Sequence, residues 1–126
     1  MFRLIFVIGT GSFAGGVARF LLSRFIHSHA HTGFPLGTMI VNIAGCLLIG
    51  VIFGISERSD ILSPEVRMFL TVGFCGGFTT FSAFAYENIA MLKDGNFLYF
   101  SLYTGLSVFF GLLAVNMGNL FIQKIL

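Results

Sequence analysis

Four long apolar stretches, separated by short polar connections, fill almost the whole chain. The stretches run from about Leu4 to Ile26, Pro35 to Ser56, Val66 to Leu92 and Phe97 to Ile122. A helix needs about 20 mostly apolar residues to cross the hydrocarbon core of a bilayer. Because each stretch reaches that length, the pattern predicts four transmembrane helices, and their even number places both termini on one side.

The polar connections carry signals that end one helix and begin the next. The first runs from His27 to Gly33 and is soon followed by Pro35, which suits the first turn of a helix. In the second, from Glu57 to Glu65, the Ser63-Pro64 pair predicts a helix start. Residues 93–96 read Lys-Asp-Gly-Asn and predict a tight turn.

Composition narrows the class of protein further. Hydrophobic residues make up 56% of the 126 positions and charged residues 10%, with a mean hydropathy of +0.96, whereas a typical soluble domain is about 25% charged. We therefore expect one all-α membrane domain over residues 1–126.

The net charge of +2 is scattered and offers nucleic acid no basic patch. The first stretch outlasts the apolar region of a signal peptide, so it is expected to remain as the first helix.

Orientation in the bilayer depends on Lys and Arg in the short connections. The predicted side of the termini carries four basic residues, Arg3, Arg58, Arg67 and Lys124. The other side carries Arg24 and Lys93, with Arg19 inside the first helix near that half. This weak asymmetry leaves two possibilities open: a slight preference for termini inside, or insertion both ways with pairing between inverted copies.

Arg19 is a charged residue within an apolar stretch, where it needs a partner, a cavity or water. It follows Gly11 and Gly15 at intervals of four, and small residues on such a stripe let two helices approach closely. Arg19 would then point into the protein or into a water-filled vestibule that attracts anions. Snorkelling to the nearer interface, with a purely structural role, is the alternative.

Two pairs of polar residues lie one helical turn apart in other stretches. Thr38 and Asn42 share a face of the second, and the Asn42 amide offers two N–H donors that suit an anion in a dry site. Tyr103 and Ser107 share a face of the fourth, continued by Gly111, and their hydroxyls would line a polar track. Hydrogen bonding within or between helices explains both patterns equally simply.

Residues 73–84, Gly-Phe-Cys-Gly-Gly-Phe-Thr-Thr-Phe-Ser-Ala-Phe, carry the strongest signal in the chain. Each glycine weakens a helix by about 1 kcal/mol, so the third helix is expected to break here and free backbone carbonyls. Such carbonyls bind cations in broken transporter helices. Phe81 and Phe84 share a face, with Ser82 between them, and the positive edges of their rings can stabilise a small anion. Lipid-facing phenylalanines on an unbroken helix are the alternative.

Several further residues receive weaker expectations. His27, His29 and His31 alternate, and we expect an exposed polar loop there rather than a metal site. Cys46 and Cys75 lack metal-ligand spacing and are expected to be buried as small hydrophobic side chains. Glu87 lies deep in the third stretch; a place near the interface, a bond to a neighbour and a pathway entrance all stay open.

Together these segments resemble a known family, the small bacterial-type fluoride channels called Fluc. The resemblance covers nearly the whole chain, through residues 11–19 of the first helix, 37–45 of the second and 73–84 of the third. The sequences GTMIVN and GGFTTFSAF are its most specific parts.

The resemblance implies a dual-topology, antiparallel homodimer in the bacterial plasma (inner) membrane, with two fluoride pathways and a central structural sodium ion. Backbone carbonyls of Gly76 and Thr79 from both subunits would hold the sodium, and Arg19 would line the vestibule. The expected pathway residues are Thr38, Asn42, Thr80, Phe81, Ser82, Phe84, Tyr103 and Ser107. The implied activity is passive export of fluoride that enters the cell as HF.

Two positions depart from the family pattern. Ala83 stands where many members have a hydroxyl residue, and Gly111 where some carry a second serine of the track. The first departure puts one hydrogen-bond donor near the phenylalanines in doubt, and two consequences stay open: lower conduction, or hydrogen bonding taken over by Ser82 and Thr80.

Two other classes compete with a fluoride channel. A small multidrug transporter is also a four-helix dual-topology dimer, but it relies on a carboxylate in its first helix, and Leu4–Ile26 contains none. A non-transporting membrane subunit would need no break in its third helix. The chain has no Walker motif and no nucleophile–base constellation, so we expect no enzymatic activity.

Overall fold

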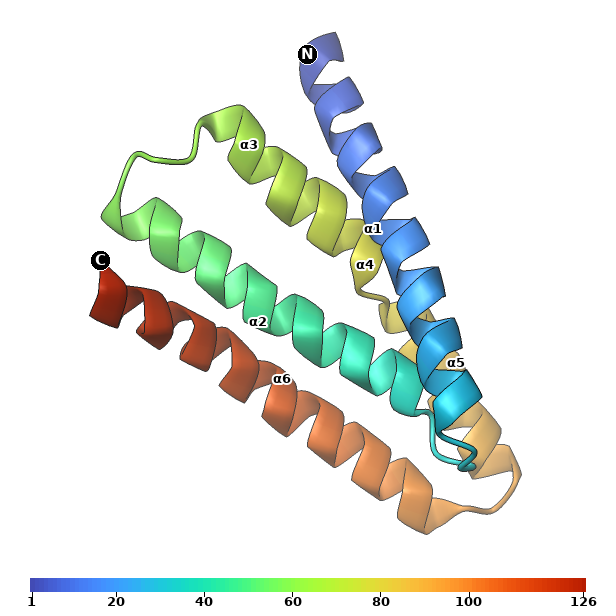
Figure 1. Cartoon of the computed structure of the whole chain (residues 1–126). Helices are drawn as coiled ribbons and strands as arrows, with labels where there is room; N and C mark the ends of the chain where they lie inside the picture. Colours follow the sequence, from blue (N-terminus) through green and yellow to red (C-terminus); the bar gives the residue numbers. More distant parts are fainter.

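The computed structural model describes residues 1–126 as an all-helical chain (Figure 1). Three spans are single helices, α1 (Phe2–His29), α2 (Leu36–Arg58) and α6 (Phe97–Ile125). The third span is composite, with α3 (Pro64–Met68), the π-helix η1 (Phe69–Cys75), α4 (Gly76–Phe78) and α5 (Phe81–Lys93). All four spans are long and apolar enough to cross a membrane, which confirms the predicted architecture.

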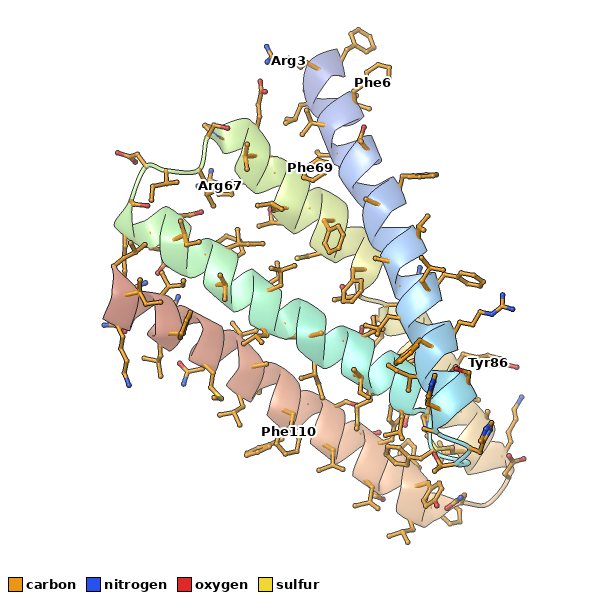
Figure 2. All side chains as sticks on the ribbon, viewed as in Figure 1. Arg3, Phe6, Arg67, Phe69, Tyr86 and Phe110 are labelled. Carbon is orange, nitrogen blue, oxygen red and sulfur yellow. The ribbon has the colours of Figure 1, made fainter.

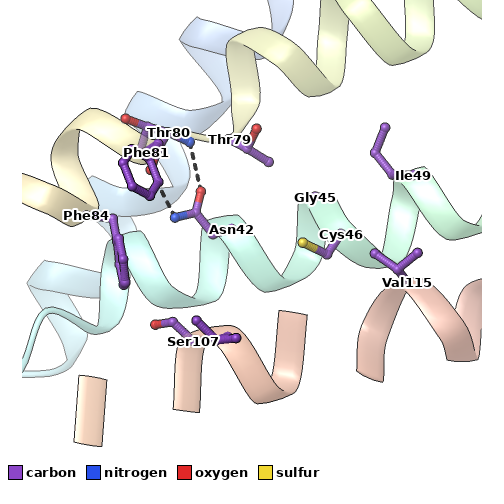
Figure 3. A pocket seen from close by; sticks show the side chains of 11 residues that line it. Asn42, Gly45, Cys46, Ile49, Thr79, Thr80, Phe81, Phe84, Ser107 and Val115 are labelled. Carbon is purple, nitrogen blue, oxygen red and sulfur yellow. Dashed lines mark hydrogen bonds between the residues drawn. The ribbon is translucent and has the colours of Figure 1, made fainter. Parts of the chain in front are cut away.

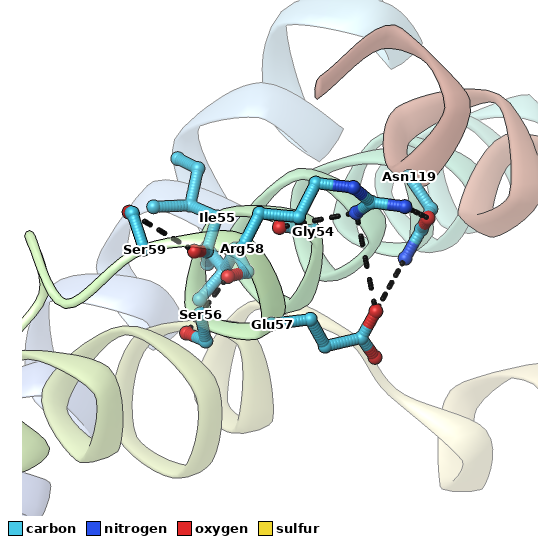
Figure 4. Close-up of polar contacts among 8 residues, drawn as sticks. Gly54, Ile55, Ser56, Glu57, Arg58, Ser59 and Asn119 are labelled. Carbon is cyan, nitrogen blue, oxygen red and sulfur yellow. Dashed lines mark hydrogen bonds and ion pairs between the residues drawn. The ribbon is translucent and has the colours of Figure 1, made fainter. Parts of the chain in front are cut away.

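Both termini lie on the same side of the molecule (Figure 1), and polar contacts join span ends on that side. Arg3 at the start of α1 forms an ion pair of 3.1 Å with Glu65 of α3. Arg58 at the end of α2 donates to the Asn119 side chain of α6 at 3.3 Å and to the Gly54 carbonyl at 3.2 Å (Figure 4). The first of these contacts joins α1 to the third span and the second joins α2 to α6, all on the side where the even number of spans places both termini.

Glycines form the seam between α2 and α6, which lie side by side along most of their length (Figure 1). A Cβ atom on Gly118 would lie 2.5 Å from the Leu47 carbonyl oxygen, and one on Gly50 would overlap the carbonyl of Val115. Because these positions carry no side chain, the two backbones approach closely. Close packing of this kind stabilises helix pairs in lipid, where the hydrophobic effect provides no drive for association.

A second glycine seam joins α1 to the first half of the third span. A Cβ atom on Gly11 would lie 2.6 Å from the Phe69 carbonyl oxygen, and one on Gly15 would overlap the carbonyl of Phe74. The stripe of Gly11 and Gly15 predicted a close helix approach, and the structure identifies its partner as η1.

Most apolar side chains lie on the outside of the molecule. Only 19 of 126 residues are buried, so the helices present most of their hydrophobic surface to the surroundings. Figure 2 shows Phe6, Tyr86 and Phe110 projecting from outer faces of α1, α5 and α6, where all three are exposed. This surface suits the hydrocarbon of a bilayer.

The structure corrects two expectations about the sequence. Helix α1 continues to His29, so His27 and His29 belong to its last turn and the connection covers only residues 30–35. Side chains stabilise this turn, because the Ser28 hydroxyl donates to the Phe25 carbonyl at 2.7 Å and His29 contacts the same oxygen. Cys75 is buried as predicted, whereas Cys46 is only partly buried.

The other predicted boundary signals have the expected geometry. The Ser63 hydroxyl caps α3 by accepting from the Val66 N–H at 3.2 Å, and Pro64 is the first helical residue. Gly95 adopts a φ of +72°, the conformation that the tight turn between α5 and α6 requires. Its N–H closes the turn by donating to the Leu92 carbonyl at 3.0 Å.

The seam between α1 and η1 predicts opposite effects at adjacent glycines. In Gly15→Ala the new methyl group meets the Phe74 carbonyl, so we expect the free energy of unfolding in mixed micelles to fall by about 1–3 kcal/mol. In Gly16→Ala the methyl group meets no atom within 4 Å, and stability should stay the same or rise with helix propensity. Equal losses of unfolding free energy in the two variants would contradict close packing of α1 against η1 at Gly15.

Candidate functional site

The third span breaks between α4 and α5, as the glycine-rich segment predicts. Thr79 (φ −85°, ψ 157°) and Thr80 (φ −148°, ψ 116°) both adopt extended backbone. The π-helix η1 leads into α4 directly before the break; π-helical turns are frequent at functional sites. A break inside a membrane span leaves backbone groups that lipid cannot satisfy, so their partners define the site.

Asn42 of α2 forms two hydrogen bonds with the backbone of Thr80 at the break, and we call this pair of bonds the clasp (Figure 3). Its Nδ2 donates to the Thr80 carbonyl at 3.0 Å, and its Oδ1 accepts from the Thr80 N–H at 2.8 Å. The two bonds together fix the orientation of the amide, since only one of its ends can accept. A primary amide carries two N–H groups, so Asn42 keeps one further donor.

Side chains also complete the two helix ends that face each other across the break. Arg19 of α1 donates from Nε to the Gly77 carbonyl at 3.1 Å, at the carbonyl end of α4 where a positive charge is favourable. The Thr79 hydroxyl donates to the Cys75 carbonyl at 2.8 Å. The Thr80 hydroxyl caps α5 by accepting from the Ala83 N–H at 3.2 Å.

A pocket of about 350 Å³ opens beside the break, between the third span, α2 and α6 (Figure 3). Its lining residues are Asn42, Gly45, Cys46, Ile49, Thr79, Thr80, Phe81, Phe84, Ser107, Val108 and Val115. None of these side chains carries a formal charge. The polar groups in the lining are an amide, three hydroxyls and a thiol, all of which include hydrogen-bond donors.

Phe81 and Phe84 meet at the pocket and connect it to α6. Their ring centroids lie 5.8 Å apart with planes inclined at 44°, and the Phe84 ring lies 5.0 Å from that of Tyr103. Phe81 is 78% exposed in the single chain. Tilted rings present edges as well as faces, and ring edges are electropositive.

The hydroxyl oxygen of Ser107 in α6 is the one buried polar side-chain atom without a hydrogen-bond partner. Its hydroxyl oxygen is shielded from solvent, receives no hydrogen bond and donates none, yet the residue lines the pocket. Buried hydroxyls are nearly always hydrogen-bonded. A free donor at the pocket suits a ligand that accepts hydrogen bonds.

Glu87 binds two hydroxyl groups next to the pocket, which answers the question that its sequence position left open. The Thr38 hydroxyl donates to Glu87 Oε2 at 2.9 Å, and the Tyr103 hydroxyl donates to Oε1 at 2.8 Å. Glu87 is therefore bonded to its neighbours on α2 and α6. The Tyr103 ring contacts Phe84, so this cluster adjoins the pocket without lining it.

The structure brings part of the predicted residue set together. Asn42, Thr79, Thr80, Phe81, Phe84 and Ser107 line one pocket. The other expected residues lie around it: Thr38 and Tyr103 at Glu87, Ser82 exposed beside Thr80, Gly76 at the break, and Arg19 against Gly77. Their roles in transport stay predictions.

Sequence reasoning missed three features of this region. Cys46 lines the pocket, although its apolar setting suggested a buried side chain. The partners of Glu87 come from distant helices, and only its isolation among apolar residues marked it. Asn88, which follows it, is buried and bonded to α6, and its place within the third apolar stretch is the signal that could have found it.

Comparison with known proteins finds similarity over nearly the whole chain. Residues 6–119 match the family described as CrcB-like protein, Camphor Resistance (CrcB). The chain is 44% identical to a fluoride-specific ion channel FluC of Flavobacterium psychrophilum over 123 residues, 98% of this chain and 99% of the relative. It is 50% identical to the protein of that name from Prosthecochloris aestuarii over 102 residues, 81% and 79% of the two chains.

The clasp predicts a local effect of removing the Asn42 side chain. In Asn42→Ala the N–H and carbonyl of Thr80 lose their partners, so we expect unfolding in mixed micelles to become easier by about 1–3 kcal/mol. Amide exchange at Thr80 and Phe81 should accelerate. Asn119→Ala, which removes an amide at the far end of α6, should leave exchange at the break unchanged; no acceleration in Asn42→Ala would contradict the clasp.

Proposed function

Because the chain belongs to the CrcB-like family, we propose that it is a fluoride-selective passive channel whose pathway passes through the pocket at the break. One observation carries the proposal. Uncharged hydrogen-bond donors and phenylalanine edges converge on a single pocket next to a broken span, in a chain that is otherwise apolar.

The chemistry of this pocket suits a small anion that accepts hydrogen bonds. Fluoride is strongly hydrated, so a pathway must replace its water at short range. The second N–H of Asn42, the free hydroxyl of Ser107 and the edges of Phe81 and Phe84 are donors or positive dipoles of the required sign.

The absence of charge from the lining favours conduction over tight binding. Conduction requires sites that are favourable enough for entry and weak enough for release. A fixed arginine or lysine in the pocket would hold the anion, and none lines it. Arg19 is bonded to the Gly77 carbonyl, just before the break. There it raises the local positive potential without lining the pocket.

We extend the proposal to an antiparallel homodimer with two pathways. Phe81 contributes to the pocket yet leaves 78% of its surface uncovered. A second copy packed against this face would cover that ring and complete the wall. Two copies related by a two-fold axis would form two equivalent pathways, and the weak charge asymmetry of the connections is compatible with insertion in both directions.

The proposal also assigns a structural sodium ion to the break. Gly76 lies in α4 and Thr79 directly follows it in extended conformation, so the Thr79 carbonyl departs from the helical direction. Backbone carbonyl oxygens are suitable ligands for a hard cation at broken helices. One chain offers two of these carbonyls, and the second copy would supply two more, so that the ion would join the two broken spans.

Passive export follows from the electrical gradient across a bacterial inner membrane, where we place the protein. A negative interior drives an anion outward by about 2.3 kcal/mol per 100 mV. Transport then requires no ATP and no covalent chemistry from the protein.

The Phe81 ring offers the sharpest test of the pathway. In liposomes loaded with fluoride, we expect Phe81→Ile to slow fluoride efflux by about tenfold, the effect of a barrier about 1.4 kcal/mol higher, because the ring edge is lost. Phe6→Ile changes an equally exposed ring at the far end of α1 and should conduct like the wild type. Equal efflux from both variants, measured with a fluoride electrode, would refute the pathway assignment.

Sodium removal tests the proposed ion at the break. In rigorously sodium-free buffer, with N-methylglucamine as the cation, we expect fluoride efflux to fall and the dimer to dissociate more readily on size-exclusion chromatography. Restoring sodium should reverse both changes. Full activity and an unchanged elution profile without sodium would exclude a structural role for the ion.

A further inference from the structure

Asn88 is a buried polar residue of α5 for which the proposed pathway gives no direct use. It is 7% exposed, and both ends of its amide are bonded. Nδ2 donates to the Phe84 carbonyl at 2.9 Å, and Oδ1 accepts from the Thr104 hydroxyl of α6 at 2.8 Å. The residue thus links a pocket-lining turn of α5 to a neighbouring span.

This link forms one of two adjacent connections between the same helices. Glu87 accepts from Tyr103 at 2.8 Å, and Asn88 accepts from Thr104 at 2.8 Å. Consecutive residues of α5 therefore meet consecutive residues of α6. Neighbouring positions on a helix point about 100° apart, so the Asn88 bond holds α5 at a second angle, besides that of Glu87, which is bonded to both Thr38 of α2 and Tyr103 of α6.

The rotation of α5 determines where the Phe84 ring lies. Phe84 precedes Glu87 and Asn88 by three and four residues and therefore shares their face of the helix. Helix α5 makes few contacts with the rest of the chain, and most of them are with α6. Few other contacts within the chain hold it in place.

We infer that Asn88 and Thr104 form a positioning pair that fixes the rotation of α5 on α6 and so holds the Phe84 ring at the pathway. The inference rests on the proposed fluoride pathway and deepens it by adding two residues that contact no transported ion. The length and direction of the hydrogen bond between Thr104 and Asn88 set the rotation of α5. Displacing the Asn88 amide would therefore rotate the Phe84 ring away from the pocket.

Simple stabilisation is the competing explanation, and it predicts a different outcome. If the pair only held the helices together, its loss would lower stability while each folded channel still conducted normally. A positioning role requires slower conduction by channels that remain folded. The two roles are separated by measuring efflux per folded dimer, with the amount of dimer quantified by size-exclusion chromatography.

Isosteric and conservative substitutions provide the test in fluoride-loaded liposomes. We expect Thr104→Val, which replaces the hydroxyl by a methyl group, to slow efflux per folded dimer by about tenfold. Thr104→Ser, which keeps the hydroxyl, should conduct within about twofold of the wild type. Thr10→Val is the matched control, because the Thr10 hydroxyl bonds only to Phe6 of its own helix, and it should have no effect.

A second variant keeps the inference testable if Thr104→Val fails to fold. Asn88→Gln retains the donor and the acceptor but moves the amide outward by one methylene group. If the pair only stabilised the protein, the channels that fold would conduct normally, whereas positioning predicts slower efflux from a folded dimer. Wild-type rates in the folded variants would overturn the positioning role alone, while a wild-type protein without fluoride efflux would refute the proposed function and this inference with it.

Discussion

A backbone N–H or carbonyl group that faces hydrocarbon without a partner is costly enough to forbid most non-helical structure in a membrane. The break at Thr79 and Thr80 places such groups within the third span, and the surrounding structure compensates for them. Asn42 forms two hydrogen bonds with the Thr80 backbone, and Arg19 donates a hydrogen bond to the Gly77 carbonyl. The break persists because α1 and α2 both supply side chains to it, and the glycine seam with η1 holds α1 close.

The same compensation creates the proposed pathway. Side chains that satisfy a broken backbone must be polar donors and acceptors, so polarity is concentrated at the one depth where the apolar wall is interrupted. Asn42 has a donor left after its two bonds to Thr80, and the pocket beside it adds the Ser107 hydroxyl and two phenylalanine rings. The break thus provides an uncharged, donor-rich pocket, which suits rapid passage of a small anion.

The sequence predicted the spans and the break because those features follow from local composition: long apolar stretches, short polar turns and clustered glycines. It could not choose among the roles of Asn42 and Glu87, because their partners lie 38 residues away at Thr80 and 49 residues away at Thr38. The end of α1 was misjudged since histidines read as loop residues, although His29 and Ser28 bond to the last turn. Asn88 was overlooked although it lies within the third apolar stretch, and only the packing of α6 shows that it is buried.

The reversal potential of the purified protein in a planar bilayer, with fluoride at unequal concentrations on the two sides and chloride making up the difference, tests the central claim most directly. A passive fluoride-selective channel predicts a steady current that reverses near the fluoride equilibrium potential and changes little when chloride is replaced by a larger anion. A reversal potential that follows chloride or protons, or no current from a folded dimer, would contradict the proposed pathway.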